Sequence, residues 1–316
     1  MLNRKSFLAG SLAAAWALLE PVPVISLNKA ERKKGTMKTT SPKKAAVIWY
    51  SQTGHTERYG KTIASVFRKN GLKVTASDYR KFDAKSIGSY DLVVMGSPVY
   101  YYEVPENFRS WIAALPSLEG IPVAAYVTFG GPGGNQYNAA MGLLQFQEEK
   151  GGIPVGMDMF GNMSTFAPTW SMGNVERILK YRHLPNKETY GRVKSMALRT
   201  LQAVWNKKTI KAEKKIDFRE MFKGGISLWG TKLLMGKHHI DTKTCLKCGT
   251  CVEKCPAGAI DLTKQKVNTS RCIACLGCVN NCPVQAMKME FLFRPVYGFN
   301  RFVEMNKVKI AEPEEG

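Results

Sequence analysis

The stretch AAVIWYSQTGHT runs from Ala45 to Thr56 and decides the fold that we expect for the first part of the chain. Its first six residues form an apolar run bounded by polar residues, which is typical of a strand buried on both faces of a parallel sheet. A loop rich in hydroxyl groups follows, and residues 57–70 then have helical character with apolar side chains on one face. This order favours a phosphate site, because the loop N–H groups and the helix N-terminus face an anion.

The loop itself supplies the candidate phosphate ligands. It lacks the lysine of a Walker loop and the glycine spacing of a dinucleotide fingerprint, so hydroxyl and backbone N–H groups would have to bind the anion. The alternative is that the serine and the threonines only cap the helix. The candidate residues of this loop are Ser51, Gln52, Thr53, Gly54, His55 and Thr56.

Four further strands are predicted in the same part of the chain. The apolar runs 91–96 and 121–129 are followed by loops at 97–105 and 130–135, and residues 72–77 and 152–160 supply two more strands. Ligands of doubly wound sheets bind at the carboxyl ends of the strands, so the three loops should meet at one edge. The sequence therefore predicts an α/β fold with a doubly wound, parallel, five-stranded sheet.

The S/T-x-T-G-x-T pattern of the first loop resembles the flavodoxin family, and the resemblance covers about residues 44–205. It implies an FMN site whose phosphate is held without a cationic side chain, although His55 stands where asparagine is commoner. It also implies that the second and third loops flank the isoalloxazine ring, with one of Tyr100, Tyr101 and Tyr102 stacked on it. The alternative is that these tyrosines only pack and that the glycines form a plain turn. The residues implied are Ser97, Pro98, Val99, Tyr100, Tyr101, Phe129, Gly130, Gly131, Gly134 and Asn135.

All eight cysteines lie in two runs, CLKCGTCVEKCP (245–256) and CIACLGCVNNCP (272–283). Disulfide frameworks belong to small secreted domains, and structural zinc usually takes two CxxC pairs separated by a longer loop. The spacing C-x2-C-x2-C-x3-C-P is instead that of bacterial [4Fe–4S] clusters, in which the fourth cysteine ligates the other cube. One cluster is therefore expected on Cys245, Cys248, Cys251 and Cys282. The second is expected on Cys272, Cys275, Cys278 and Cys255.

The two runs are halves of an internal repeat, because CPAGAI continues the first run and CPVQAM continues the second. The repeat resembles the two-cluster bacterial ferredoxin family over about residues 237–292, which implies a small α+β domain. His238 and His239 adjoin the first run. Neither is expected to be a ligand, because eight thiolates already complete both cubes.

The connecting segments are predicted from helix and charge signals. Asn174 is expected to cap a helix that Pro185 breaks. A second helix should then cover the sheet with Val193, Met196, Thr200, Leu201 and Val204, which recur at three- and four-residue steps. Residues 206–236 are expected to be a basic linker and docking segment, in which residues 226–235 pack one domain onto the other. Residues 293–316 are expected to be a C-terminal tail.

The formal net charge of +21 supports encounter with an acidic protein, nucleic acid or an anionic lipid surface. The dense basic stretches 29–44 and 207–223 could equally be solvated linkers. The sequence contains no recognisable nucleic-acid motif, and no stretch reaches the length of a transmembrane helix. We therefore expect a redox partner protein, acidic in character, with membrane-surface contact as a further option.

The first residues, MLNRKSFLAG, have the form of an export signal, because Arg4 and Lys5 precede a short uncharged segment. NRKSFL resembles the twin-arginine export motif, with Lys5 where a second arginine normally stands. Residues 1–36 are therefore expected to be a signal-like or disordered segment. The alternatives are a cytoplasmic protein that starts at Met37 and an uncleaved interfacial anchor.

The whole chain resembles the flavodoxin–ferredoxin fusion family. This implies an electron-transfer protein that passes electrons between two [4Fe–4S] clusters and an FMN, with no catalytic residue assigned. Two other functions stay open. One is an FMN-dependent reductase of a small acceptor such as a quinone, with Glu103, His55 and the tyrosines as candidate acids or bases. The other is a redox-sensing binding protein.

Overall fold

The computed structural model describes residues 35–131, 136–215 and 228–313. The expected signal-like segment therefore lies almost wholly outside the described residues. So do Gly134 and Asn135 of the third loop and residues 216–227 of the expected linker. Within the described ranges, no helix is long and apolar enough to cross a membrane.

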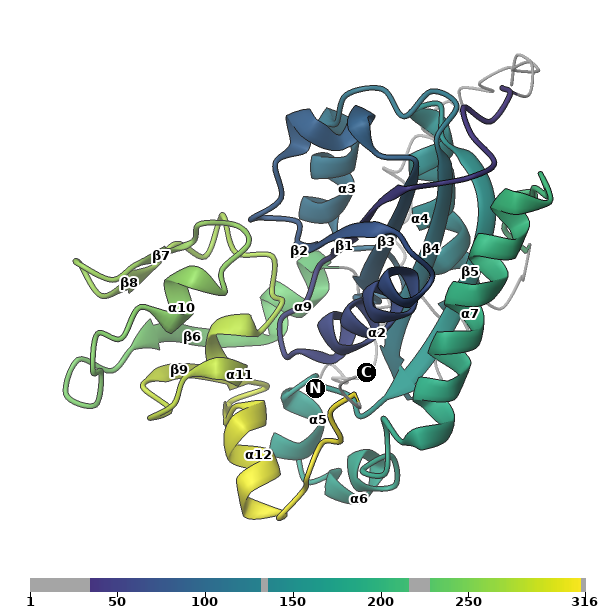
Figure 1. Cartoon of the computed structure of the whole chain (residues 1–316). Coiled ribbons are helices and arrows are strands. Elements are labelled where there is room, and N and C mark those ends of the chain that lie inside the picture. The colour runs from purple at the N-terminus through teal and green to yellow at the C-terminus, as the bar shows by residue number, and fades with distance from the viewer. Residues whose placement is uncertain (1–34, 132–135, 216–227, 314–316) are drawn as a thin grey trace, which may run out of the picture. The chain divides into compact units, whose positions relative to one another are not determined.

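Five parallel strands form the central sheet in the order β2-β1-β3-β4-β5 (Figure 1). They are β1 (Lys44–Trp49), β2 (Lys73–Asp78), β3 (Leu92–Pro98), β4 (Pro122–Gly130) and β5 (Ile153–Asn162). Strand order reverses between β1 and β3, and the last five residues of β1 are buried, as its apolar run predicts. The predicted doubly wound sheet is confirmed.

Helices cover both faces of this sheet. Helices α2 (His55–Lys69) and α7 (Lys187–Trp205) share one apolar core with it, and α3 (Glu106–Ala114) and α4 (Gln136–Glu149) share the other. A short 3-10 helix, η1 (Ala84–Ser89), precedes β3. The side chains predicted to cover the sheet from the last helix are all buried: Val193, Met196, Thr200, Leu201 and Val204.

Helix α2 begins at His55 rather than at the predicted Glu57. Gly54 has a φ of 86°, a left-handed conformation that glycine adopts without strain, and it ends the loop early. His55 and Thr56 therefore lie in the first turn of the helix.

The segment after β5 contains two short helices, α5 (Pro168–Ser171) and α6 (Val175–Leu179). The helix predicted between Asn174 and Pro185 is thus shorter than expected, and the Asn174 side chain makes no cap hydrogen bond. Tyr181 N donates to Ile178 O, and Arg182 N donates to Leu179 O. These tight turns end the helix well before the proline.

The C-terminal part has the small α+β architecture predicted for it. A three-stranded antiparallel sheet in the order β10-β9-β6 and a two-stranded β7-β8 ribbon carry short helices. The elements are α9 (Leu228–Leu234), β6 (Met235–Ile240), α10 (Thr250–Glu253), β7 (Ile260–Asp261), β8 (Lys266–Val267), α11 (Gly277–Asn281), β9 (Met287–Phe291), β10 (Arg294–Val296) and α12 (Phe299–Met305). Strand β10 and helix α12 fall within the expected tail, yet Phe299 and Phe302 of α12 are buried.

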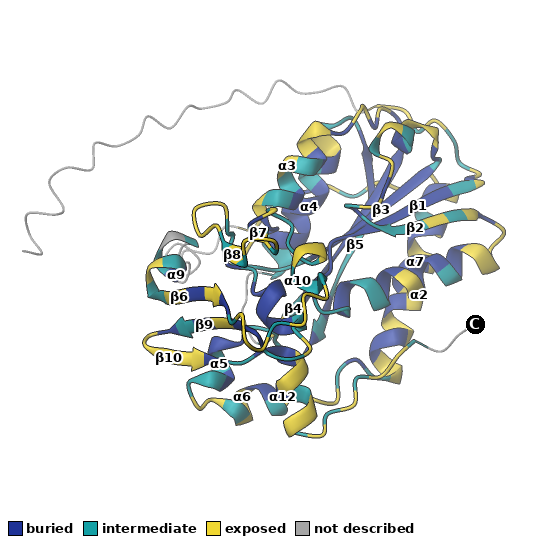
Figure 2. Cartoon of the chain, turned by 90° about the vertical axis from the view of Figure 1, so that its left-hand side faces the viewer, coloured by how far each residue is buried: buried dark blue, intermediate teal, exposed yellow. Residues whose placement is uncertain are grey.

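A shared apolar core joins the C-terminal part to the segment after β5, and Figure 2 shows α5 beside β10. The Trp170 and Phe302 ring centroids lie 4.5 Å apart, and Met163 and Ile178 belong to the same core. The interface between the segment after β5 and the C-terminal part is therefore formed largely by residues that the sequence did not single out. In the described part of the expected docking segment, Thr231 is buried whereas Leu233 is 69% exposed.

Candidate functional site

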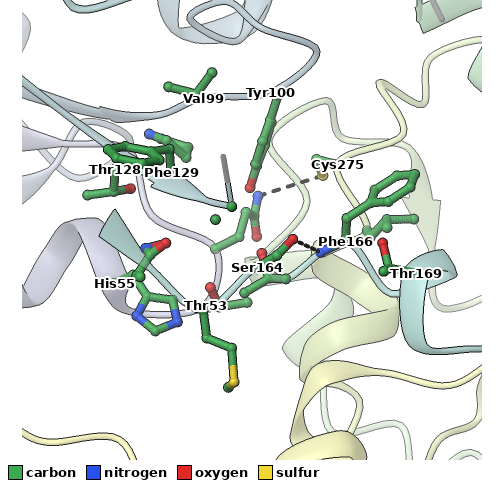
Figure 3. Close-up of a pocket in the computed structure, with 18 of the residues that line it drawn as sticks. Thr53, His55, Val99, Tyr100, Thr128, Phe129, Ser164, Phe166, Thr169 and Cys275 are labelled. Carbon is green, nitrogen blue, oxygen red and sulfur yellow. Dashed lines mark hydrogen bonds between the residues drawn. The ribbon is translucent and has the colours of Figure 1, made fainter. Parts of the chain in front are cut away.

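A cavity of about 550 Å³ lies at the carboxyl ends of β1, β3 and β4 (Figure 3), and its size suits a small-molecule ligand. The loops after these three strands line it, as expected for a doubly wound sheet. Of the predicted residues, those that line it are Ser51, Gln52, Thr53, His55, Thr56, Pro98, Val99, Tyr100, Tyr101, Phe129, Gly130 and Gly131. Gly54 and Ser97 do not. The Ser97 hydroxyl is turned to the carbonyl oxygen of Pro98, at 2.8 Å.

The first loop and the start of α2 present donors without a cationic side chain. Gly54 N donates to Ser51 Oγ at 3.1 Å and closes the loop, and α2 has no side-chain cap on its first turn. The hydroxyl oxygens of Thr56 and Thr128 lie 2.8 Å apart, so one of the two hydroxyls keeps its proton for a ligand. The guanidinium of Arg58 is paired with Glu312, Nε to Oε1 at 2.9 Å.

His55 and Gln52 carry buried polar atoms that have no partner among the described residues. These atoms are both ring nitrogens of His55 and Oε1 of Gln52. Burial, and then the charge of Arg58, lowers the pKa of His55 to about 3, so the ring is neutral and offers one donor and one acceptor. An unpaired buried polar group costs about 1–3 kcal/mol, which a bound ligand can recover. The phosphate, hydroxyl and carbonyl groups of FMN fit this donor and acceptor set.

The eight cysteines gather into two sets, each around a small hollow of its own. One hollow is lined by Cys245, Cys248, Cys251 and Cys282, and the other by Cys255, Cys272, Cys275 and Cys278. The fourth cysteine of each run thus lies with the first three of the other run, which is the grouping that the spacing predicts. None of the eight is in a disulfide. Among the described residues, no three His, Cys, Asp or Glu side chains lie close enough to hold one metal ion, whereas a cube takes thiolates at separate iron corners.

The backbone around the two cysteine sets repeats with the sequence. Ala259 N donates to Cys255 Sγ at 3.2 Å, and Ala286 N donates to Cys282 Sγ at 3.1 Å. Lys247 and Ala274, which also occupy equivalent places, both have positive φ, at 53° and 50°. Each run therefore folds into the same tight loop, with backbone N–H groups directed at the sulfur atoms, as suits thiolate ligands of a cluster.

Comparison with known proteins assigns both parts of the chain. A family model described as flavodoxin matches residues 47–162, and one described as a 4Fe-4S dicluster domain matches residues 237–283. The chain is a fusion of a flavodoxin domain and a ferredoxin-like domain. The flavodoxin domain makes it an FMN flavoprotein, the ferredoxin-like domain makes it an iron–sulfur protein, and both are electron-transfer domains.

Relatives of the flavodoxin domain are distant. A flavodoxin of Clostridium saccharobutylicum is 27% identical over 111 residues, which cover 34% of this chain and 69% of that protein. Similar solved structures include oxidised flavodoxin 1 of Bacillus cereus, with 16% identity and a TM-score of 0.40. The match covers 50% of this chain and 97% of the flavodoxin chain. Two-electron reduced flavodoxin of Megasphaera elsdenii has 17% identity and a TM-score of 0.36, and matches 50% of this chain and 99% of its own.

The three tyrosines of the second flavodoxin loop take different positions. Tyr100 lies in the cavity wall (Figure 3), with its ring centroid 6.0 Å from that of Tyr50. Tyr101 donates its hydroxyl to the carbonyl oxygen of Ala274, in the ferredoxin-like domain, at 2.9 Å. Tyr102 is exposed and also reaches the cavity. Glu103 is exposed, pairs with Arg109 at 3.2 Å and does not line the cavity.

The two cysteine sets have unequal surroundings. Cys275 lines the flavodoxin cavity, and Cys278 of the same set is only 7% exposed. His238, not expected to be a ligand, lies with Nε2 3.5 Å from Cys278 Sγ. In the other set Cys248 is exposed, beside Leu246 at 67% exposure. One set therefore borders the flavodoxin cavity, and the other borders solvent.

Several cavity residues were missed by the sequence analysis. Thr128 and Asn162 lie at the carboxyl ends of β4 and β5, so the rule that placed the three loops could have found them. The others lie at the start of α4, in the segment after β5, in α9 and in the ferredoxin-like domain, and no sequence signal places them at this cavity. They are Gln136, Met163, Ser164, Thr165, Phe166, Thr169, Arg177, Ile178, Tyr181, Thr231, Ala274, Cys275, Leu276 and Phe291.

Proposed function

We propose that this protein passes electrons between two [4Fe–4S] clusters and one FMN within a single chain. The observation that carries the proposal is the position of Cys275, a thiol of the ferredoxin-like domain that lines the flavodoxin cavity. When bound, FMN exchanges one or two electrons and each cluster exchanges one. The protein therefore has to hold the cofactors a short distance apart, bury them and tune their reduction potentials.

The flavin would be held by the three loops. Thr53, Thr56 and the start of α2 would bind the phosphate, and neutral His55 would supply one further donor. Tyr100 and Phe129 are the cavity residues whose rings could lie against the isoalloxazine. Gly130 and Gly131 would leave room for a close backbone approach.

The two clusters would be held by the two cysteine sets, and their unequal exposure supports a division of roles. The set with Cys275 would hold the cluster nearer to the flavin. The set with Cys248 would hold the cluster that exchanges electrons with a partner at the surface. An acidic redox protein is the partner that suits a chain of net charge +21.

Cofactor analysis tests the proposal. Anaerobically prepared protein should contain about eight iron and eight sulfide per chain, the content of two cubes, and should release FMN on denaturation. A colourless protein loaded with zinc, or flavin released as FAD or riboflavin, would contradict it.

Reduction of a small acceptor such as a quinone is a second candidate function, and one observation favours it. Thr169, Arg177 and Tyr181 of the α5–α6 segment also line the cavity, and they add polar groups beyond the three flavin loops. Chemically reduced protein should then be oxidised by a soluble quinone with saturation kinetics, and Arg177→Ala should raise the KM. A rate linear in quinone concentration and equal in both proteins would exclude this candidate.

A further inference from the structure

The phosphate loop of the flavodoxin domain touches a cysteine of the ferredoxin-like domain. Gln52 is almost completely buried, and its Nε2 lies 3.8 Å from Cys275 Sγ (Figure 3, dashed line at Cys275). The same Nε2 donates to the hydroxyl oxygen of Tyr50 at 2.8 Å. Gln52 therefore ties the end of β1 to the nearer cysteine set.

Tyr50 completes this contact from the other side. It follows β1 directly, is fully buried, and has its ring fixed by Tyr79 and Phe108 at centroid distances of 5.5 and 6.2 Å. The Tyr50 hydroxyl lies beside Cys275 and accepts from Gln52, so its own proton is available to the sulfur atom of Cys275.

The side chain of Asn281 bridges the two loops. Asn281 Nδ2 donates to the carbonyl oxygen of Gln52 at 3.0 Å and to that of Gly277 at 2.7 Å. A side chain at Gly277 would overlap the amide group of Gln52. The donors are therefore fixed relative to Cys275 and are not two mobile surface groups.

We propose that Tyr50 and Gln52 are positioning residues that hydrogen-bond to Cys275 Sγ and thereby raise the reduction potential of the cluster nearer to the flavin, an inference that rests on the proposed function. A reduced cluster carries one more negative charge than an oxidised one, and part of that charge lies on the cysteine sulfurs. Donors directed at a sulfur atom stabilise the reduced cluster, which is the more negatively charged form, whereas burial in an apolar site destabilises it. The flavodoxin domain thus offsets, by two side chains, the effect of burying Cys275.

The test is a potentiometric titration followed by EPR on the full chain, with Tyr50→Phe and Gln52→Met. Both substitutions keep the size of the side chain and remove the donor. Each should lower the reduction equilibrium constant of one cluster about tenfold, the size of one hydrogen bond to a charged group. Tenfold corresponds to about 59 mV for a one-electron couple. Cys275→Ser identifies which signal belongs to that cluster.

The matched control is at the other cysteine set, where the Thr250 hydroxyl lies 3.4 Å from Cys248 Sγ. Thr250→Val should shift only the other cluster. Unchanged potentials in both Tyr50→Phe and Gln52→Met, or equal shifts of both clusters, would overturn the inference and leave the proposed function standing. A parent protein with only one cluster signal, or none, would overturn the proposed function and the inference with it.

Discussion

Two threonines, one in the phosphate loop and one in the first turn of α2, have the most direct role proposed for any side chains of the flavodoxin domain. Thr53 and Thr56 line the cavity, and Thr56 shares a hydroxyl pair with Thr128. Thr53→Val combined with Thr56→Val should weaken FMN binding by about 1–3 kcal/mol for each lost charged hydrogen bond. Fluorescence titration of flavin-free protein measures this.

Thr62→Val is the matched control for that pair. Thr62 is a buried threonine of the same helix, but its hydroxyl donates to the carbonyl oxygen of Arg58 and it does not line the cavity. The control should keep the affinity of the parent. Unchanged affinity in the double variant would refute the assignment of the phosphate loop.

His55 should make flavin-free protein sensitive to acid. Its pKa is about 3 in the folded chain, against 6.5 for an ordinary histidine, so the unfolded chain takes up the proton first. This group therefore contributes stability above pH 6.5 that is lost as the pH falls toward 3. The loss is at most about 1.4 kcal/mol per pH unit.

Denaturant unfolding at a series of pH values measures this contribution. The stability of His55→Gln should fall less steeply below pH 6.5 than that of the parent. His183→Gln, at an exposed histidine, controls for the loss of one imidazole from the chain. Equal slopes in the parent and in His55→Gln would show that the ring is not held neutral by burial.

At the scale of elements, the two cysteine loops have the same local structure, but the fourth cysteine of each loop belongs to the cysteine set of the other. Cys255 follows the first loop in sequence, yet it lines the hollow of Cys272, Cys275 and Cys278. Cys255→Ser should therefore damage the cluster nearer to the flavin, and Cys282→Ser should damage the other. EPR of each variant after anaerobic reduction reads this out. Loss of the cluster held by Cys245 and Cys248 in Cys255→Ser would contradict the cross-pairing.

The sequence predicted those elements whose signals are local. Apolar runs predicted β1, β3 and β4, weaker signals predicted β2 and β5, and the cysteine spacing predicted the grouping of the two sets, because each follows from short-range geometry. The short helix α6 and the helix α12, which buries Phe299 and Phe302, were not predicted correctly. Their extent depends on the core formed by Trp170, Ile178 and Phe302, which brings together residues far apart in the chain. The contact of Gln52 with Cys275 could not be predicted from the sequence for the same reason, because the two residues lie far apart in the chain.

At the scale of the whole molecule, the folded unit should not need the first residues of the chain. Lys38 N donates to Gly120 O, and Met37 packs against the core shared by α2 and α7. A shortened chain beginning at Met37 should therefore fold and bind both kinds of cofactor, as measured by flavin and iron content. Loss of either cofactor in this chain would contradict the prediction.

We propose export through the twin-arginine-like segment, with a cytoplasmic protein starting at Met37 as the alternative. Fractionation of the native host followed by N-terminal sequencing separates the two. A full-length cytoplasmic chain that retains Met1 would contradict both.

Electron transfer from the clusters to the flavin can be followed by rapid mixing. A reduced, acidic one-electron donor protein is mixed anaerobically with the parent, with Cys275→Ser and with Cys248→Ser, while flavin absorbance and cluster EPR are followed. Flavin reduction should slow at least about tenfold in both variants, although each keeps its FMN, because each breaks one of the two clusters between donor and flavin. Flavin reduction that is as fast in both variants as in the parent would show that the clusters do not supply electrons to the flavin.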